Sequence, residues 1–85
     1  MFNRETPESI AQTRTVSAKA ILTNTADLRQ YPYRHLAIAS PHGFGLTSVT
    51  DALMAAEALA PYGWDLLNVT EFGASQVVYA FLRRR

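Results

Sequence analysis

The sequence predicts a single small α+β domain of the order β-α-β-β, in which one helix covers one face of a three-stranded, mainly antiparallel sheet. Three observations support this class. A chain of 85 residues is too short for more than one hydrophobic core. Its 48% hydrophobic and 18% charged residues are typical of a globular protein. Three strand-like segments surround one helical pattern in its second half.

The first predicted strand covers residues 33–40 and follows a break at Pro32. Proline restricts its own φ and favours an extended conformation in the residue before it. Within the segment, Leu36 and Ile38 fall on one face and smaller or polar residues on the other. This period of two indicates a strand.

The predicted helix covers residues 47–60, with Thr47 or Ser48 as its N-cap and Asp51 at capping-box spacing from Ser48. Pro61, just after this segment, is expected to end the helix. The apolar residues of the segment form one helical stripe. They are Val49, Ala52, Leu53, Ala56, Leu59 and Ala60.

Two further strands are predicted at residues 64–71 and 76–83. The four residues between them include Gly73, and a connection of this length and composition suits a β-hairpin. These strands should therefore be antiparallel neighbours, and the strand at 33–40 is expected to pair antiparallel as well.

Residues 1–30 are more polar than the rest, and we expect them to form a polar N-terminal arm that is partly ordered or is ordered by a partner. Residues 31–85 are expected to form the folded domain. Within the arm, a strand over residues 15–22 and a helix that starts at Thr6 are both compatible with the pattern of apolar residues. The sequence leaves these two alternatives open.

Both faces of the last strand are apolar, as in a sheet that is covered on both sides. The N-terminal segment or a second copy of the chain can cover the face that the helix leaves open, and we favour the second copy. Leaving large side chains bare costs roughly 1.5–3 kcal/mol each in lost burial. Trp64 is in addition the expected anchor of the core, because Gly63 lets its ring turn inward. The candidate interface residues are Trp64, Val77, Tyr79 and Phe81.

The segment from residue 59 to residue 69 contains Gly63-Trp64-Asp65-Leu66-Leu67 and precedes a strand that ends in aromatic and basic residues. It resembles a family of small bacterial domains of unknown function, which carry a Gly-Trp-Glu-Leu-Val box after a helix and a final strand with an aromatic residue and a basic pair. The chain differs from that pattern at Ala60, Asp65 and Leu67. The resemblance implies a fold for residues 33–84 and no activity.

The loop at residues 41–48 leads into a helix N-terminus, where free N–H groups favour an anion. A small anionic or phosphate ligand is therefore an alternative function, with His42 as a possible catalytic residue. The phosphate-loop signature requires a lysine that the chain lacks here, so we favour a plain connection. The residues of this alternative site are His42, Gly43, Gly45, Thr47 and Ser48.

Charge and composition select few function classes. The net charge is only +1, and we interpret Arg83, Arg84 and Arg85 as a solvated tail, so we do not expect nucleic acid as a partner. No cysteine is present and no carboxylate cluster accompanies the two histidines, so we expect no metal, no cofactor and no enzyme. The chain lacks a membrane span or signal pattern. We expect a cytoplasmic interaction or regulatory module that forms a small homo-oligomer and binds another protein through residues 1–30.

Overall fold

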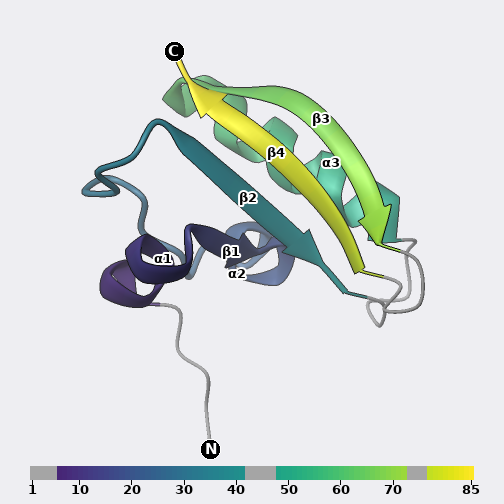
Figure 1. Cartoon of the computed structure of the whole chain (residues 1–85), viewed down its shortest axis with the longest axis horizontal. Coiled ribbons are helices and arrows are strands. Elements are labelled where there is room, and N and C mark those ends of the chain that lie inside the picture. Colours follow the sequence, from purple (N-terminus) through teal and green to yellow (C-terminus); the bar gives the residue numbers. More distant parts are fainter. Residues whose placement is uncertain (1–5, 42–47, 73–76) are drawn as a thin grey trace, which may run out of the picture.

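The computed structural model describes residues 6–41, 48–72 and 77–85, and these form one mixed sheet with helices packed against it (Figure 1). The α+β class is confirmed, but within the described residues the sheet has four strands in the order β1-β2-β4-β3. The prediction of three strands and one helix was therefore incomplete. The elements in chain order are α1 (Pro7–Thr13), β1 (Thr15–Ser17), α2 (Ala18–Leu22), β2 (His35–Ser40), α3 (Ser48–Leu59), the 3-10 helix η1 (Ala60–Tyr62), β3 (Trp64–Phe72) and β4 (Val77–Arg84).

Capping residues divide the N-terminal segment into short elements. The Thr6 hydroxyl accepts a hydrogen bond from the Ser9 N–H at 3.1 Å and begins α1, which ends at Arg14 in the left-handed conformation with φ 57°. The Ser17 hydroxyl accepts one from the Ala20 N–H at 3.0 Å and begins α2. Side-chain oxygens at these positions satisfy N–H groups that a helix leaves free. The segment thus contains both a helix that starts after Thr6 and a short strand.

The segment that we expected to form a polar arm contributes to the core in its described part. β1 pairs parallel with β2, and Val16 lies opposite Ile38. α1, β1 and α2 contain few apolar residues, but these residues belong to the same hydrophobic core as those of the second half. Ile10, Val16, Ala18 and Ala20 are all buried.

The second half follows the predicted order, with small changes at the element ends. β4 pairs antiparallel with both β2 and β3, as expected. The helix α3 continues into η1, and Gly63 ends that turn with φ 96°, a conformation that glycine adopts without strain. The predicted hairpin turn and the loop before α3 lie largely outside the described residues.

A β-bulge in β3 changes which of its side chains share a face. Leu66 pairs with Leu82 and Asn68 pairs with Phe81, so Leu67 is the extra residue. Beyond the bulge, Val69 pairs with Ala80 and therefore lies on the same face as Leu66. Simple alternation along the strand would place these two residues on opposite faces.

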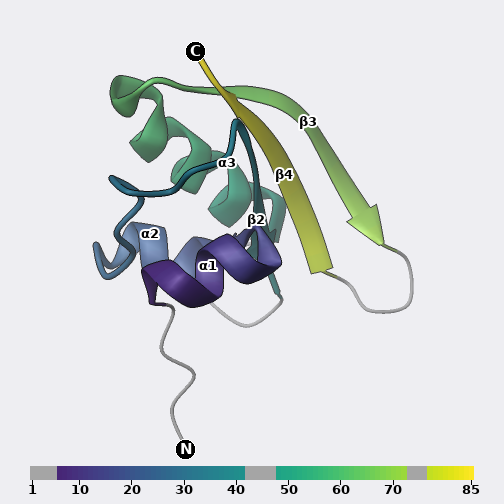
Figure 2. The same cartoon turned by 60° about the vertical axis from the view of Figure 1, so that its left-hand side comes forward.

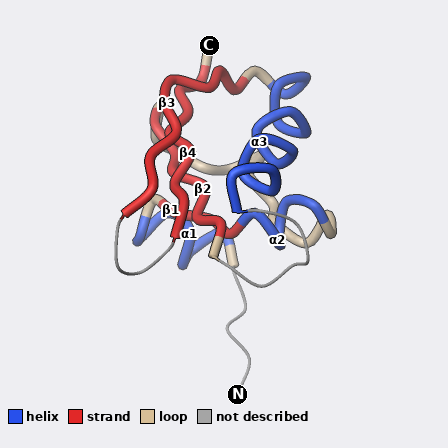
Figure 3. Tube along the Cα trace, turned by 90° about the vertical axis from the view of Figure 1, so that its right-hand side faces the viewer, coloured by secondary structure: helices blue, strands red, loops and turns tan. Residues whose placement is uncertain are grey.

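The helices α2 and α3 lie on the same side of the sheet (Figures 2 and 3). The face that they cover carries the buried side chains of β2 and β4, which pack with apolar residues of α3. These core residues include Leu36, Ile38, Val78, Ala80, Leu82, Ala52, Ala55, Ala56 and Leu59. α1 lies beside β1 at one edge, and no described helix covers β3 or β4 on the opposite side.

Candidate functional site

The strands β2 and β4 present a narrow apolar strip on the side of the sheet away from α3. We call it the open sheet face. The register places Ala37 beside Phe81 and Ala39 beside Tyr79. The rings of Tyr79 and Phe81 stack, with centroids 6.2 Å apart and planes inclined by 14°. The open sheet face consists of the half-buried residues Ala37, Ala39, Val77, Tyr79 and Phe81.

Its relief follows from the residue types on neighbouring strands. On β4 the two stacked aromatic rings form a ridge, and on β2 the alanines beside them leave a trough. Polar residues border this strip on both outer strands. Thr15 and Ser17 of β1 pair with the alanines, and Asn68 and Thr70 of β3 pair with the aromatic residues. An apolar centre with a polar rim is the usual anatomy of a protein interface.

Only three of the four candidate interface residues lie together. Val77, Tyr79 and Phe81 share the open sheet face, whereas Trp64 pairs with Arg84 on the helix-covered face and is only 3% exposed. Trp64 is therefore a residue of the core and takes no part in this surface. Its ring packs at 5.9 Å from the ring of buried Tyr31. This position agrees with its expected role as a core anchor.

The alternative site at residues 41–48 lies mostly outside the described residues, which include neither His42, Gly43, Gly45 nor Thr47. Ser48 is described and begins α3. Its carbonyl oxygen accepts a hydrogen bond of 2.8 Å from the buried hydroxyl of Ser40. Asp51, one turn further, is buried, and its Oδ2 has no hydrogen-bond partner within the described part of the chain.

We expected the three C-terminal arginines to form a solvated tail, but two of them contact other parts of the chain. Arg84 donates a hydrogen bond of 2.8 Å to the carbonyl of Tyr31. Arg85 pairs with Asp65 and donates to the carbonyl of Ala60. Arg83 remains exposed. Two of these three side chains thus tie the end of β4 to other elements, which leaves a smaller basic surface than the sequence suggests.

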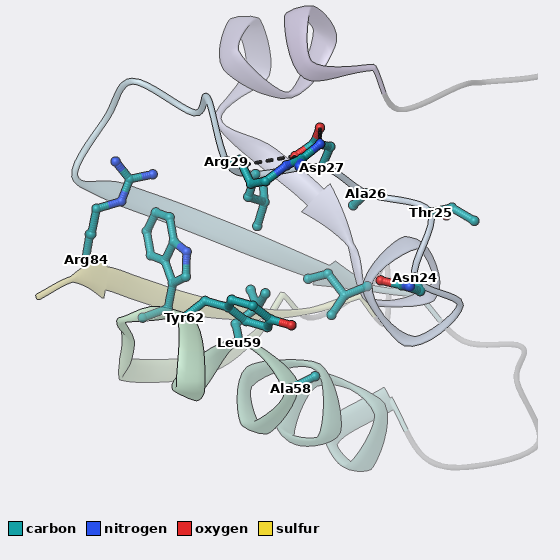
Figure 4. A pocket seen from close by; sticks show the side chains of 12 residues that line it. Asn24, Thr25, Ala26, Asp27, Arg29, Ala58, Leu59, Tyr62 and Arg84 are labelled. Carbon is teal, nitrogen blue, oxygen red and sulfur yellow. Dashed lines mark hydrogen bonds and ion pairs between the residues drawn. The ribbon is translucent and has the colours of Figure 1, made fainter.

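A groove of about 650 Å³ lies on a different part of the molecule, between the loop after α2 and the end of α3 (Figure 4). Ala58, Leu59 and Tyr62 form one side, and residues 24–29 form the other. In that loop, Arg29 donates two hydrogen bonds of 3.0 Å to the carboxylate of Asp27. These bonds lower the pKa of Asp27 to about 2. Sequence reasoning missed this groove.

Three general features bear on what the site can do. No group of three or more His, Asp or Glu side chains among the described residues could hold a metal ion. No helix in the described ranges is long and apolar enough to cross a membrane. Comparison with protein-family models, curated proteins and solved structures finds no match to the chain. The resemblance to the Gly-Trp-Glu-Leu-Val domains therefore stays a prediction.

Proposed function

We propose that the protein is a non-enzymatic interaction module that works as a homodimer joined through the open sheet face. The observation that supports this proposal is the self-complementary relief of that face. Tyr79 and Phe81 form a ridge directly beside the trough at Ala37 and Ala39. A two-fold contact uses the same patch on both copies. A ridge in that patch therefore needs a trough in the same patch to accommodate it.

The strand register defines which two-fold axis satisfies this requirement. One possible axis lies midway between the two facing sheets, runs parallel to the strands and passes over the line between β2 and β4. It places β2 of each copy over β4 of the other copy. The ridge of each copy then lies over the trough of the other, and Phe81 faces the partner's Ala37. An axis perpendicular to the strands would place aromatic rings over aromatic rings and leave the troughs empty. Facing sheets pack about 10 Å apart, and the side chains of their inner faces interdigitate.

The shape of the molecule gives this contact enough area. The protein measures 32 × 31 × 21 Å, and Figure 1 looks down the shortest axis, so the open side of the sheet lies on a broad face. A specific interface buries about 800 Å² on each copy. That is roughly one-seventh of the 5781 Å² surface of the chain. Because the aromatic residues are already half-buried, each gains only part of the burial energy. We therefore expect a dimer of micromolar affinity.

A second protein partner can use the N-terminal segment only in its folded form. Ile10 and Val16 are fully buried, so releasing this segment would expose the core. The exposed sides of α1 and α2 are the surfaces that remain available. We therefore extend the proposed role to a dimer that presents two copies of this helical surface.

Sedimentation equilibrium of the full chain, over about 1–200 µM, tests the dimer. We expect a concentration-dependent shift from monomer to dimer, and we expect Phe81→Asp to remain monomeric with an unchanged circular dichroism spectrum. The control is Met54→Asp, which changes an exposed residue of α3 on the other side of the molecule and should still dimerise. A wild-type chain that stays monomeric throughout, or a Phe81→Asp chain that dimerises normally, would overturn the proposal.

A further inference from the structure

We infer that the groove between residues 24–29 and the end of α3 binds a small, flat, apolar carboxylate, whose anionic group contacts Arg84. This site lies away from the open sheet face, so the inference does not depend on dimerisation. The groove volume of about 650 Å³ falls in the range typical of small-molecule sites. The argument rests on its lining, on its charge and on the position of the arginine.

Apolar and polar groups contribute to the lining of the groove in nearly equal measure. Ile21 and Leu28 contribute aliphatic surface from the N-terminal half, and Leu59 contributes it from α3. Tyr62 adds an aromatic residue that is 78% exposed, although a side chain of this size usually packs against other groups. An apolar body bound here would cover that ring.

The charges around the groove leave one positive charge without a counter-ion. The ion pair between Arg29 and Asp27 neutralises both of its members. Arg84 forms no ion pair with any carboxylate of the described residues, because Asp65 on the neighbouring strand pairs with Arg85. The lining of the groove therefore has a net charge of +1 from these side chains, which favours an anionic ligand.

Arg84 is held in a fixed position at one end of the groove (Figure 4). Its Cζ lies 4.7 Å from the centroid of the Trp64 ring, and its Nη2 donates to the Tyr31 carbonyl. These contacts leave Nε and Nη1 without a hydrogen-bond partner among the described residues. A guanidinium can bind a carboxylate through two parallel hydrogen bonds, and a fixed one loses little freedom on binding. A carboxylate on a flat apolar body matches the charge and the apolar part of the walls.

Two probes of nearly the same shape test the inference, namely cinnamate and its neutral amide, cinnamamide. Each is titrated into the isotopically labelled full chain and followed by NMR. The chain has a single tryptophan, so the indole N–H signal of Trp64 reports directly from the wall of the groove. We expect cinnamate to shift this signal and the Nε–H signal of Arg84, with a dissociation constant of about 1–10 mM for a ligand of this size. Cinnamamide should bind at least about tenfold more weakly, because it lacks the charge.

Two variants locate the binding. Ala58→Phe fills the groove from an exposed position of α3 and should abolish the shifts. Met54→Phe makes the same kind of change at an exposed position that does not line the groove, and it should bind as the wild type does. Equal affinity for the two probes would show that Arg84 does not select an anion and would overturn the inference. So would the absence of any shift, or unchanged binding by a folded Ala58→Phe chain.

Discussion

The guanidinium of Arg84 lies over the indole ring of Trp64, with 4.7 Å between Cζ and the ring centroid. The two residues are cross-strand partners at one end of the β3–β4 pair. The same arginine donates to the carbonyl of Tyr31, whose ring contacts Tyr33 edge to face at 5.6 Å. Arg14 in turn lies 4.0 Å above the ring of Tyr33. A chain of contacting aromatic and basic groups thus connects the N-terminal segment to the end of β4.

Replacing Arg84 by alanine should lower the free energy of unfolding by about 1–3 kcal/mol, because it removes a cation–π contact and a hydrogen bond to a backbone carbonyl. Urea denaturation followed by the fluorescence of Trp64 measures this change. The matched control is Arg83→Ala, which alters the exposed neighbour and should change stability by less than about 0.5 kcal/mol. Equal effects at the two positions would contradict the structural role that we assign to Arg84.

The pKa of Asp27 should be about 2 in the folded chain, because Arg29 donates hydrogen bonds to the charged carboxylate. This value lies below the usual 3.8, so the pair stabilises the fold above pH 3.8, and its contribution is lost as the pH falls through about 2. Both side chains are accessible to solvent, and we therefore expect little effect on overall stability. A carboxyl ¹³C NMR titration measures the pKa directly. In Arg29→Gln the pKa should rise only part of the way to its usual value, because the backbone N–H of residue 29 still donates to the carboxylate. An unchanged low value would show that the Arg29 side chain does not cause the shift.

The sequence predicted the order and the approximate bounds of the elements in the second half, because its strands and its helix are long enough to show their periods. The predicted apolar stripe of the helix was wrong in part, because Val49 and Leu53 are exposed and Ala55 is buried. The sequence did not distinguish helix from strand in the N-terminal segment, because β1 has only three residues and α2 only five. Periodicity cannot be read over such lengths, and the capping residues Thr6 and Ser17 were the signals that remained. The bulge at Leu67 was also missed. The position of a bulge depends on how β3 pairs with β4, and a single extra residue leaves no recognisable pattern in the sequence of β3.

The candidate surface was predicted in part for the same reason. Alternation along β4 correctly groups Val77, Tyr79 and Phe81 on one face. It cannot place Trp64, because the register between two strands decides which residues share a face, and alternation within each strand does not determine that register. The groove depends on contacts between residues far apart in the chain. Nothing local in the sequence indicates that Arg84 lies near residues 24–29.

Shortening a core residue of β1 tests whether the N-terminal segment folds together with the rest. Val16 is fully buried opposite Ile38, so Val16→Ala should cost about 1–3 kcal/mol through lost burial and a residual cavity. The expected result is a single cooperative unfolding transition at a lower urea concentration. Gln12→Ala changes an exposed residue of α1 and serves as the control. If Val16→Ala left the unfolding of the domain unchanged, the segment would be an independent arm.

A pair of complementary charges tests the register of the proposed dimer. With the two-fold axis parallel to the strands, residue 81 of one copy faces residue 37 of the other, because the two positions are directly paired within each copy. Phe81→Lys alone and Ala37→Glu alone should each remain monomeric, since a dimer of either variant would bury charges without partners. An equimolar mixture should form a heterodimer, in which one lysine faces one glutamate and the other half of the contact is wild type. Sedimentation equilibrium or native mass spectrometry distinguishes these species. A mixture that stays monomeric, although the wild-type chain dimerises, would exclude this axis and would favour one perpendicular to the strands.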